Sequence, residues 1–544
     1  MNNPKEKITP AHLRAALATL KKYKAGKATL DRRIVSNEQW WKMRHWGEIP
    51  VDSADINRPR PASAWLFNSL ANKHADAMDS IPEPTVLPRE QSDSEAARKL
   101  SQLLPAVLER CGYEKLYSDG WWYKLKNGTM CQAVLWDSYL DGGRGDIAIK
   151  NIDLLNLYWE PGIKDIQDSR NLFYVSYIDT DLLESEYPEL KGRLGGDTVN
   201  AERYKYDDMN DFGDNSGKTA VIDWYYKKRV NGRTVLHYCR FAGENLLYAS
   251  ENDPALCDTG FYNHGKYPFV LDPLFILEGT PCGFGYIDIM RDAQMYIDKL
   301  GQVVLEHTVQ MSRKRFFIKQ NSSIREEEFA DWRKPFVHVS GSLSADDIRE
   351  IKLDPLDSSV MNALNSKIEE LKETSGNRDF SQGGTANGVT AASAIAALQE
   401  AGSKLSRDMI KGTYYAFQNV CYLVIELIGQ FYDAPRSYRI TGENYGSDGG
   451  FAYLDNSLIR EQDMGELFGE PLGMRKPIFD VVCRAGKKSP FSKAAQNELA
   501  KELFKLGFFS PELKTQALAC IDMMDFEGKE SVKRLIEQGE ERTK

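Results

Sequence analysis

One segment of the sequence has the residue types of a phosphate-binding loop, because Gly213, Gly217, Lys218 and Thr219 lie close together in a polar stretch. A Walker A loop needs four residues between its two glycines, so that successive backbone N–H groups can wrap a phosphate. Here three residues separate the glycines, and the segment leads into the strand-like run AVIDWYY instead of opening a helix. We therefore interpret it as a polar loop that ends in Gly-Lys-Thr.

A second glycine pattern, Cys282-Gly283-Phe284-Gly285, begins like a dinucleotide-binding fingerprint. Asp288 stands where the third glycine of that fingerprint should be, so the pattern is incomplete. Glycines at the start of a helix commonly let the chain turn sharply into it, and we expect that role here.

The histidines and acidic residues do not predict a metal site. The seven histidines never fall at i,i+4 spacing or next to a cysteine, which argues against a helix-borne HExxH zinc site. Asp207, Asp208, Asp211 and Asp214 could collect a hard cation, but their spacing is not that of an EF-hand, and a solvated acidic loop is the better interpretation. There is also no GxSxG elbow, so the sequence predicts no catalytic residues, no metal, no cofactor and no enzyme activity.

The charge balance argues against a protein that coats DNA tightly. Lys and Arg number 70 against 79 Asp and Glu, which gives a net charge of −9, whereas tight non-specific binding needs a cationic surface. A local basic patch remains compatible with this balance. The pairs Trp40-Trp41 and Trp121-Trp122 could stack on bases, but paired aromatic residues more often anchor a fold or an interface.

Length and composition indicate a globular protein of several domain-sized pieces. The chain has 544 residues, of which 42% are hydrophobic and 27% charged, which excludes wholesale disorder and collagen-like repeats. Eight cysteines without a CxxC pair suggest reduced, intracellular thiols. No stretch approaches eighteen apolar residues and the start lacks an apolar signal core, so we expect neither a membrane span nor a signal peptide.

The first half of the chain predicts helices followed by strands. Helices are expected at 9–24, 61–81 and 93–118, from stripes of apolar residues at helical spacing. Between 119 and 275, short β-rich runs alternate with Gly, Asn and Asp turns. Asn231-Gly232 joins two such runs and is suited to a type I′ hairpin turn.

The second half predicts two helices, 286–312 and 357–374, on either side of a small module at 314–355 with strand-like RFFIKQ and PFVHVSG. The glycine-rich stretch 375–390 leads to a long helix at 391–432, β-like patches return at 436–441 and 477–484, and residues 489–541 are helical again. The predicted fold class is therefore α+β. The narrow apolar stripes of the two flanking helices cannot build a closed core, which favours a symmetric ring in which neighbouring copies complete the packing.

Several segments, taken in order, resemble the portal proteins of tailed bacteriophages, the ring at the capsid vertex through which DNA enters and leaves. The resemblance covers about residues 28–540, and none of its segments is a strict motif with invariant chemistry. It is carried by RPASAWLFNSLANKHADAMDSIPEPTVLP, EGTPCGFGYIDIMRDAQMYIDKL, QGGTANGVTAASAIAALQEAGSKLSRD and FDVVCRAGKKSPFSKAAQNELAKELFKLG.

The resemblance implies the portal-protein fold and a division of the chain into its regions. These regions would be an N-terminal arm or helix (1–27), a mixed α/β wing (28–275 and 433–487), two stem helices (276–313 and 356–374), a small α/β clip (314–355), a tunnel loop (375–390), a long wing-spanning helix (391–432) and a helical crown (488–544).

It also implies sites on this chain. The tunnel loop in the DNA channel would comprise Gly376, Asn377, Arg378, Asp379, Phe380, Ser381, Gln382, Gly383, Gly384, Thr385 and Asn387. Stem residues that line the channel would be Lys367, Glu370, Lys372 and Glu373. Clip residues that bind partners would be Arg313, Lys314, Arg315, Lys319, Arg325, Trp332 and Phe336, although a solvated charged face explains the clip cations equally well.

The function that follows by resemblance is a dodecameric channel for DNA packaging and ejection. Its partners would be other copies of the chain, the large terminase subunit, a head–tail adaptor, the major capsid or scaffold protein, and double-stranded DNA bound without sequence preference, with no membrane. Its place would be the portal vertex of the virion, after assembly in the host cytoplasm. Two alternatives stay open: another ring-forming virion protein such as an adaptor or baseplate component, and an intracellular enzyme that processes nucleic acid.

Overall fold

The computed structural model of the chain has two compact units. The first comprises Met1–Glu38, Leu70–Asp288 and Thr385–Lys544, and the second comprises Gln39–Ser69 and Ile289–Gly384. Helices combined with small antiparallel sheets place the chain in the predicted α+β class. The structure describes residues 7–51, 58–195, 217–230, 232–312, 315–318, 327, 348–351, 354–376, 404–440, 450–463, 466–467, 470–471, 474–485, 490–508, 514–524, 529, 532–533 and 536.

A five-stranded antiparallel sheet forms one part of the first unit, with the strand order β4-β5-β6-β7-β8. Its two longest strands form the predicted hairpin, because Val230 pairs with Arg233 and Gly232 has a positive φ of 78°. The turn therefore holds two residues, as the Asn-Gly pair predicts. The strands are β4 (Leu157–Trp159), β5 (Asn171–Asp179), β6 (Lys218–Val230), β7 (Arg233–Ala242) and β8 (Asn245–Ala249).

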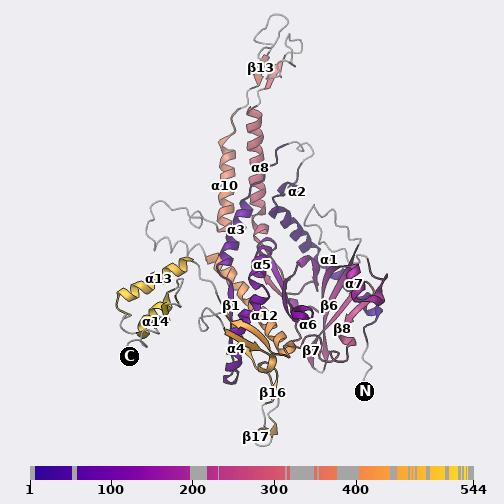
Figure 1. The fold of residues 1–544 in the computed structure, drawn as a ribbon. Helices are drawn as coiled ribbons and strands as arrows, with labels where there is room; N and C mark the ends of the chain where they lie inside the picture. Colours follow the sequence, from indigo (N-terminus) through magenta and orange to yellow (C-terminus); the bar gives the residue numbers. More distant parts are fainter. Residues whose placement is uncertain are drawn as a thin grey trace. The chain divides into compact units, whose positions relative to one another are not determined.

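Helix α1 (Pro10–Trp41) lies against this sheet (Figure 1). Leu13, Leu20 and Tyr23 are buried in one apolar cluster with Phe173 and Phe241 of the sheet. The predicted helix 9–24 was too short, because the chain stays helical for another 17 residues after Lys24. The extension is held by a buried ion pair one turn apart, Lys27 to Asp31 at 3.2 Å, and by buried Ile34.

A three-stranded sheet, β3-β2-β9, also belongs to this unit, and helices α5 and α12 pack against it. A buried lysine joins the sheet and the two helices. Lys124 Nζ of α5 lies 2.7 Å from the carboxylate of Asp272 in β9 and 2.7 Å from the hydroxyl of Thr413 in α12. A buried cation is stable there because both of its contacts are hydrogen bonds to fixed oxygen acceptors. These elements are β2 (Thr129–Asp137), β3 (Asp146–Asn151), β9 (Phe269–Pro273), α4 (Ser94–Arg110), α5 (Tyr113–Asn127) and α12 (Lys404–Phe431).

The single helix predicted at 93–118 is two helices, α4 and α5. The apolar stripe was assigned correctly, since Leu100, Leu104 and Val107 are buried. The break falls at Gly112, whose φ of +67° lies in the left-handed region that ends helices. The second helix then runs to Asn127, so the strand-rich region begins at β2 and not at residue 119.

Strands β1 (Pro82–Pro88) and β20 (Phe479–Ala485), which are far apart in the sequence, pair in the first unit. β20 and β14 (Arg436–Ile440) confirm the predicted patches at 477–484 and 436–441. The helical end contains α13 (Pro490–Lys505) and α14 (Lys514–Met523). The remaining elements are α2 (His45–Glu48), α3 (Trp65–Met78, within the predicted 61–81), α6 (Leu140–Gly143), α7 (Thr180–Glu186), β10 (Phe275–Ile276), β11 (Gly283–Phe284), β15 (Gly450–Leu454), β16 (Gln462–Asp463), β17 (Glu466–Leu467), β18 (Glu470–Pro471) and β19 (Met474–Arg475).

The second unit contains the two helices predicted on either side of the small module. They are α8 (Tyr286–Ser312) and α10 (Ser358–Ser375), and they lie side by side (Figure 1). Between them in the sequence, β12 (Arg315–Ile318) pairs with β13 (Ile348–Ile351). The first strand confirms the start of RFFIKQ, whereas PFVHVSG and residues 391–403 of the long predicted helix lie outside the described residues. No helix in the described part of the chain is long and apolar enough to cross a membrane.

Two glycines let the chain pass through a crowded turn at the base of α8. A Cβ atom on Gly283 would lie 2.3 Å from the carbonyl oxygen of Phe275, and one on Gly285 would lie 2.6 Å from that of Leu125. Neither glycine has a positive φ, so close backbone approach, and not the sharp turn we expected, requires them. Asp288 closes the turn by accepting the Gly285 N–H at 2.8 Å.

Replacing Gly285 with alanine should lower the free energy of unfolding by about 1–3 kcal/mol, the usual cost of forcing an extra carbon into a packed site. All three nearest atoms are backbone atoms, which cannot rotate away. Gly412→Ala is the control, because a Cβ at that helical position has nothing within 4 Å. Denaturant titration of both variants measures the difference, and equal stability would contradict the crowding.

Candidate functional site

Helices α8 and α10 of the second unit contact each other through polar and aromatic groups. The Lys367 ammonium of α10 lies 5.7 Å from the centre of the Tyr296 ring of α8. His307 Nε2 of α8 donates at 2.9 Å to the carbonyl oxygen of Asp354, which precedes α10. Asp357 caps the start of α10 by accepting the Ser359 N–H at 2.7 Å, and Gly376, with a φ of +69°, ends it.

The charged residues of α10 that the sequence assigned to a channel lining form local ion pairs. Lys367 pairs with Glu370 at 2.5 Å, and Lys372 pairs with Glu369 at 3.4 Å. Each lysine is therefore partly neutralised by a carboxylate three residues away, and exposed Glu373 adds another negative charge. This surface carries acidic groups and paired cations, which gives it little attraction for phosphates.

One face of α8 carries exposed apolar side chains beside the exposed carboxylate of Asp292, and we call it the apolar face. Ile289, Tyr296 and Val303 follow each other at seven-residue intervals, which places them on one side of a helix. Their exposed fractions are 39%, 49% and 44%, so each side chain stays more than a third exposed within one copy of the chain. Further exposed apolar side chains lie towards its end, namely Leu305, Val309 and Met311.

The opposite face of α8 is polar and holds an extended segment of the same unit. Gln294, Asp298, Gln302 and Glu306 recur every four residues, so they form one stripe. Gln302 Nε2 donates to the carbonyl oxygen of Pro59 at 2.9 Å, and Glu306 lies 3.6 Å from Arg58. Gln294 Oε1 accepts the Leu66 N–H at 3.3 Å. We call the segment Arg58–Leu66 the strap.

Asp298 is the centre of a buried hydrogen-bond cluster, which we call the Asp298 cluster and which also includes His45, Ser63 and Gln294. Its Oδ1 accepts the Ser63 N–H at 3.1 Å, the Ser63 hydroxyl at 3.0 Å and the Gln294 amide at 3.0 Å. Its Oδ2 accepts from His45 Nδ1 at 2.5 Å. Sequence reasoning missed this cluster, although the polar repeat on α8 was visible in the sequence.

The Asp298 cluster contains Ser, His and Asp but not in the order of a hydrolytic triad. A nucleophilic serine must give its proton to histidine, whereas the Ser63 hydroxyl donates to the carboxylate. His45 Nε2, the nitrogen that would face a serine, lies 3.1 Å from the carbonyl oxygen of Trp40. The ring of Trp40 stacks on that of His45 at 4.7 Å, so the cluster anchors the strap to α8 and presents no reactive group.

The side chains of both tryptophan pairs pack against other parts of the protein. Trp40 and Trp121 are buried, Trp41 stacks on Phe67 at 5.0 Å, and Trp122 stacks on His74 at 3.9 Å. This agrees with an anchoring role and leaves none of the four rings positioned as an open platform for bases.

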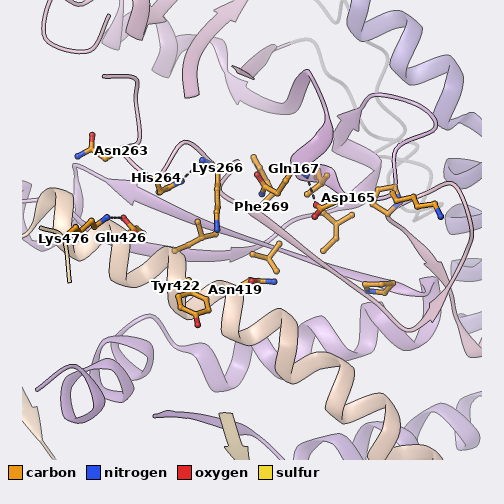
Figure 2. A pocket seen from close by; sticks show the side chains of 17 residues that line it. Asp165, Gln167, Asn263, His264, Lys266, Phe269, Asn419, Tyr422, Glu426 and Lys476 are labelled. Atoms are coloured by element: carbon orange, nitrogen blue, oxygen red, sulfur yellow. Dashed lines mark hydrogen bonds and ion pairs between the residues drawn. The ribbon is translucent and has the colours of Figure 1, made fainter. Parts of the chain in front are cut away.

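A cavity of about 900 Å³ in the first unit lies between α12 and the segment that contains β9 (Figure 2). Lys476 and Glu426 form an ion pair at 2.5 Å on its wall. His264 Nδ1 accepts the Lys266 N–H at 3.0 Å. Burial and the nearby ammonium groups of Lys266, Lys476 and Lys227 lower the pKa of His264 to about 3. The histidine is therefore neutral at physiological pH and forms part of the cavity wall.

The His264 environment makes stability depend on pH. Its pKa is lower in the folded chain than its ordinary value of 6.5, so protonation favours unfolding, and stability is lost as the pH falls from about 6.5 towards 3. His264→Gln should reduce the slope of unfolding free energy against pH in this window by up to about 1.4 kcal/mol per pH unit, the effect of one proton. Thermal unfolding from pH 7 to 4 checks this. Exposed Asn263→Ser should keep the original slope, and an unchanged slope in His264→Gln would contradict the assignment.

The described residues bring together no set of three His, Cys, Asp or Glu side chains that could hold a metal ion. The eight cysteines are free thiols. Burial raises the pKa of the Cys111 thiol to about 11, so this thiol is a poor nucleophile.

Most of the other predicted site residues lie outside the described part. Of the clip set, Arg315 lies in β12, opposite Ile351, and its backbone alone is described. Of the tunnel loop, Gly376 is described as the end of α10. The predicted residues outside the described ranges are Arg313, Lys314, Lys319, Arg325, Trp332, Phe336, Asn377, Arg378, Asp379, Phe380, Ser381, Gln382, Gly383, Gly384, Thr385 and Asn387.

The family model described as Phage P22-like portal protein matches residues 27–252 and 276–544, which is most of the chain and includes α8 and α10. No curated protein matches the chain significantly.

Proposed function

Because the chain belongs to the P22-like phage portal protein family, we propose that twelve copies form a ring at one capsid vertex and that duplex DNA passes through its central channel. The family itself gives the coarser statement, that this is a structural portal protein of the phage head. The ring, its copy number and the path of the DNA are the proposal.

The observation that best supports assembly into a ring is the exposed apolar face of α8. Apolar side chains that stay more than a third exposed on a long helix are stabilised when a second surface covers them, at about 25 cal/mol per Å² of buried area. The strap already occupies the polar face of α8. Lys367 of α10 reaches the ring of Tyr296 on the apolar face, and the apolar side chains there still stay more than a third exposed. Another copy of the chain would cover what these contacts leave exposed.

The paired charges of α10 favour a channel lining that lets DNA slide. A lining of free cations would hold phosphates and oppose each step, because every contact releases counterions and adds affinity. Lys367 and Lys372 are paired with carboxylates, and Glu373 adds negative charge. We place Lys367, Glu370, Lys372 and Glu373 on the channel side of the stem.

The other parts of the proposal rest on the resemblance to portal proteins. Residues 375–390 form the narrow tunnel loop, and the clip, residues 314–355, docks the large terminase subunit during packaging and a head–tail adaptor afterwards. The capsid or scaffold protein contacts the ring during assembly in the host cytoplasm, and the mature location is the virion.

The experiment is native mass spectrometry of the full-length protein together with negative-stain imaging. Twelve 61.7-kDa chains give a species of about 740 kDa, and images should show rings with a central hole. Rings of eleven or thirteen copies would change the proposed copy number but would still support a DNA channel. A strictly monomeric protein at micromolar concentration would contradict the ring.

A further inference from the structure

Helix α1 carries an excess of positive charge in an otherwise acidic chain. Between Pro10 and Trp41 there are seven lysines and arginines against two carboxylates, whereas the whole chain has a net charge of −9. The two carboxylates, Asp31 and Glu38, are buried and paired with Lys27 and Lys126. The exposed charged residues of α1 are therefore all cationic.

The exposed cations lie along one outward surface. Arg14, Lys21, Lys22 and Arg32 are all exposed, and at 1.5 Å per residue the first and last are about 27 Å apart. Arg14 lies 3.8 Å from Glu244, but both side chains are more than half exposed, so this pair contributes little. We call these four residues the α1 basic face.

The residues between the cations are small. Ala15, Ala18, Ala25 and Ala28 are exposed on the same helix. Small side chains let a smooth, rigid surface approach the helix closely, so that all four cations can reach it together. The exposed part of α1 also has no aromatic or large apolar side chain, the residue types that usually anchor protein partners.

A lipid surface does not fit this helix. An amphipathic helix binds a membrane by inserting its apolar face, but Leu13, Leu20 and Tyr23 are already buried against the five-stranded sheet. The exposed surface of α1 can therefore attract a partner only through its cations, which extend over about 27 Å and suit a partner with negative charges along a similar length.

We propose that the α1 basic face binds the phosphate backbone of duplex DNA without sequence preference, at a surface other than the α10 residues that we assign to the channel. The choice of DNA as the partner rests on the proposed function, because a protein that conducts DNA is exposed to duplex at high concentration. A stretch of about 27 Å corresponds to about eight base pairs, and cations spread over that length can neutralise several phosphates at once.

The probe is relaxed, covalently closed circular duplex DNA, which cannot thread a closed ring and therefore reports binding outside the channel. Binding of the full-length assembled protein is measured by gel shift at 50–200 mM salt, a range over which phosphate contacts weaken measurably. The triple variant K21Q/K22Q/R32Q should bind about 10- to 100-fold more weakly at the lowest salt. The slope of log K against log salt should fall by about 2.7, which corresponds to three phosphate contacts.

The matched control is K115Q/R229Q/K411Q, which removes the same three charges from exposed positions on other elements. It should bind circular DNA like the unmodified protein. Equal loss in both triple variants, or no binding of circular DNA by the unmodified protein, would overturn the proposal. So would preferential binding of polyglutamate over DNA at equal charge, which would indicate an acidic protein partner. Negative-stain imaging of the same samples tests the ring separately. Rings that do not bind circular DNA would contradict only the α1 proposal, whereas the absence of rings would contradict the proposed function.

Discussion

Asp298→Ala should lower the free energy of unfolding by about 3–5 kcal/mol, the usual cost of removing one partner from a buried charged network. The Asp298 side chain is 1% exposed and accepts four hydrogen bonds, from His45, from Gln294 and from two groups of Ser63. Without the carboxylate, these donors stay buried and lose their acceptor, which costs more than the lost bonds themselves. We expect the strap to separate from α8 and assembly to fail with it.

The control for this variant lies on the same helix. Asp292 is 81% exposed and 4.0 Å from Arg291, so Asp292→Ala should change the free energy of unfolding by less than about 0.5 kcal/mol. Asp298→Asn should fall between the two, because it keeps an oxygen acceptor but can present a donor to His45. Denaturant titration and light scattering measure stability and assembly. Equal midpoints for the Asp292 and Asp298 variants would show that the Asp298 cluster does not hold the strap.

The helices of the second unit could be predicted from the sequence because their signals are local. Apolar spacing without proline over 286–312 and 357–374 gave α8 and α10 to within one residue at each end. The hairpin at Gly232 was also predicted from a local signal, the Asn-Gly pair between two β-rich runs. The sequence prediction ended helix α1 at residue 24. In the structure the next residues stay helical, and buried Lys27 donates to the distant carbonyl oxygen of Leu157 at 2.7 Å.

The Asp298 cluster could not be predicted in the same way, because its members come from three separate segments. His45, Ser63 and Asp298 are joined across as many as 253 positions of sequence, and no spacing rule links them. The stripe of Gln294, Asp298, Gln302 and Glu306 on α8 indicated a polar face. A polar face usually meets solvent, and only the structure shows that the strap covers it.

The apolar face of α8 gives the second large prediction. Val303→Asp should convert the assembled protein into a 61.7-kDa monomer, because every copy would place an unpaired carboxylate in the interface proposed to close the ring. The lost burial of one valine contributes about 1.5–3 kcal/mol per interface, and desolvating the new charge adds to it. The chain itself should stay folded, because Val303 is 44% exposed within one copy.

Thr308→Asp tests whether charge alone explains such a loss. It adds the same carboxylate to the same exposed end of α8, but five residues further along the helix and therefore on a different side. Native mass spectrometry should find monomers for Val303→Asp and rings for Thr308→Asp, with similar circular dichroism for both. Rings in the Val303 variant would mean that this face of α8 points to solvent in the assembly, and another surface would then have to join the copies. Monomers in both variants would point to helix destabilisation, since a carboxylate near the C-terminal end of a helix opposes its dipole.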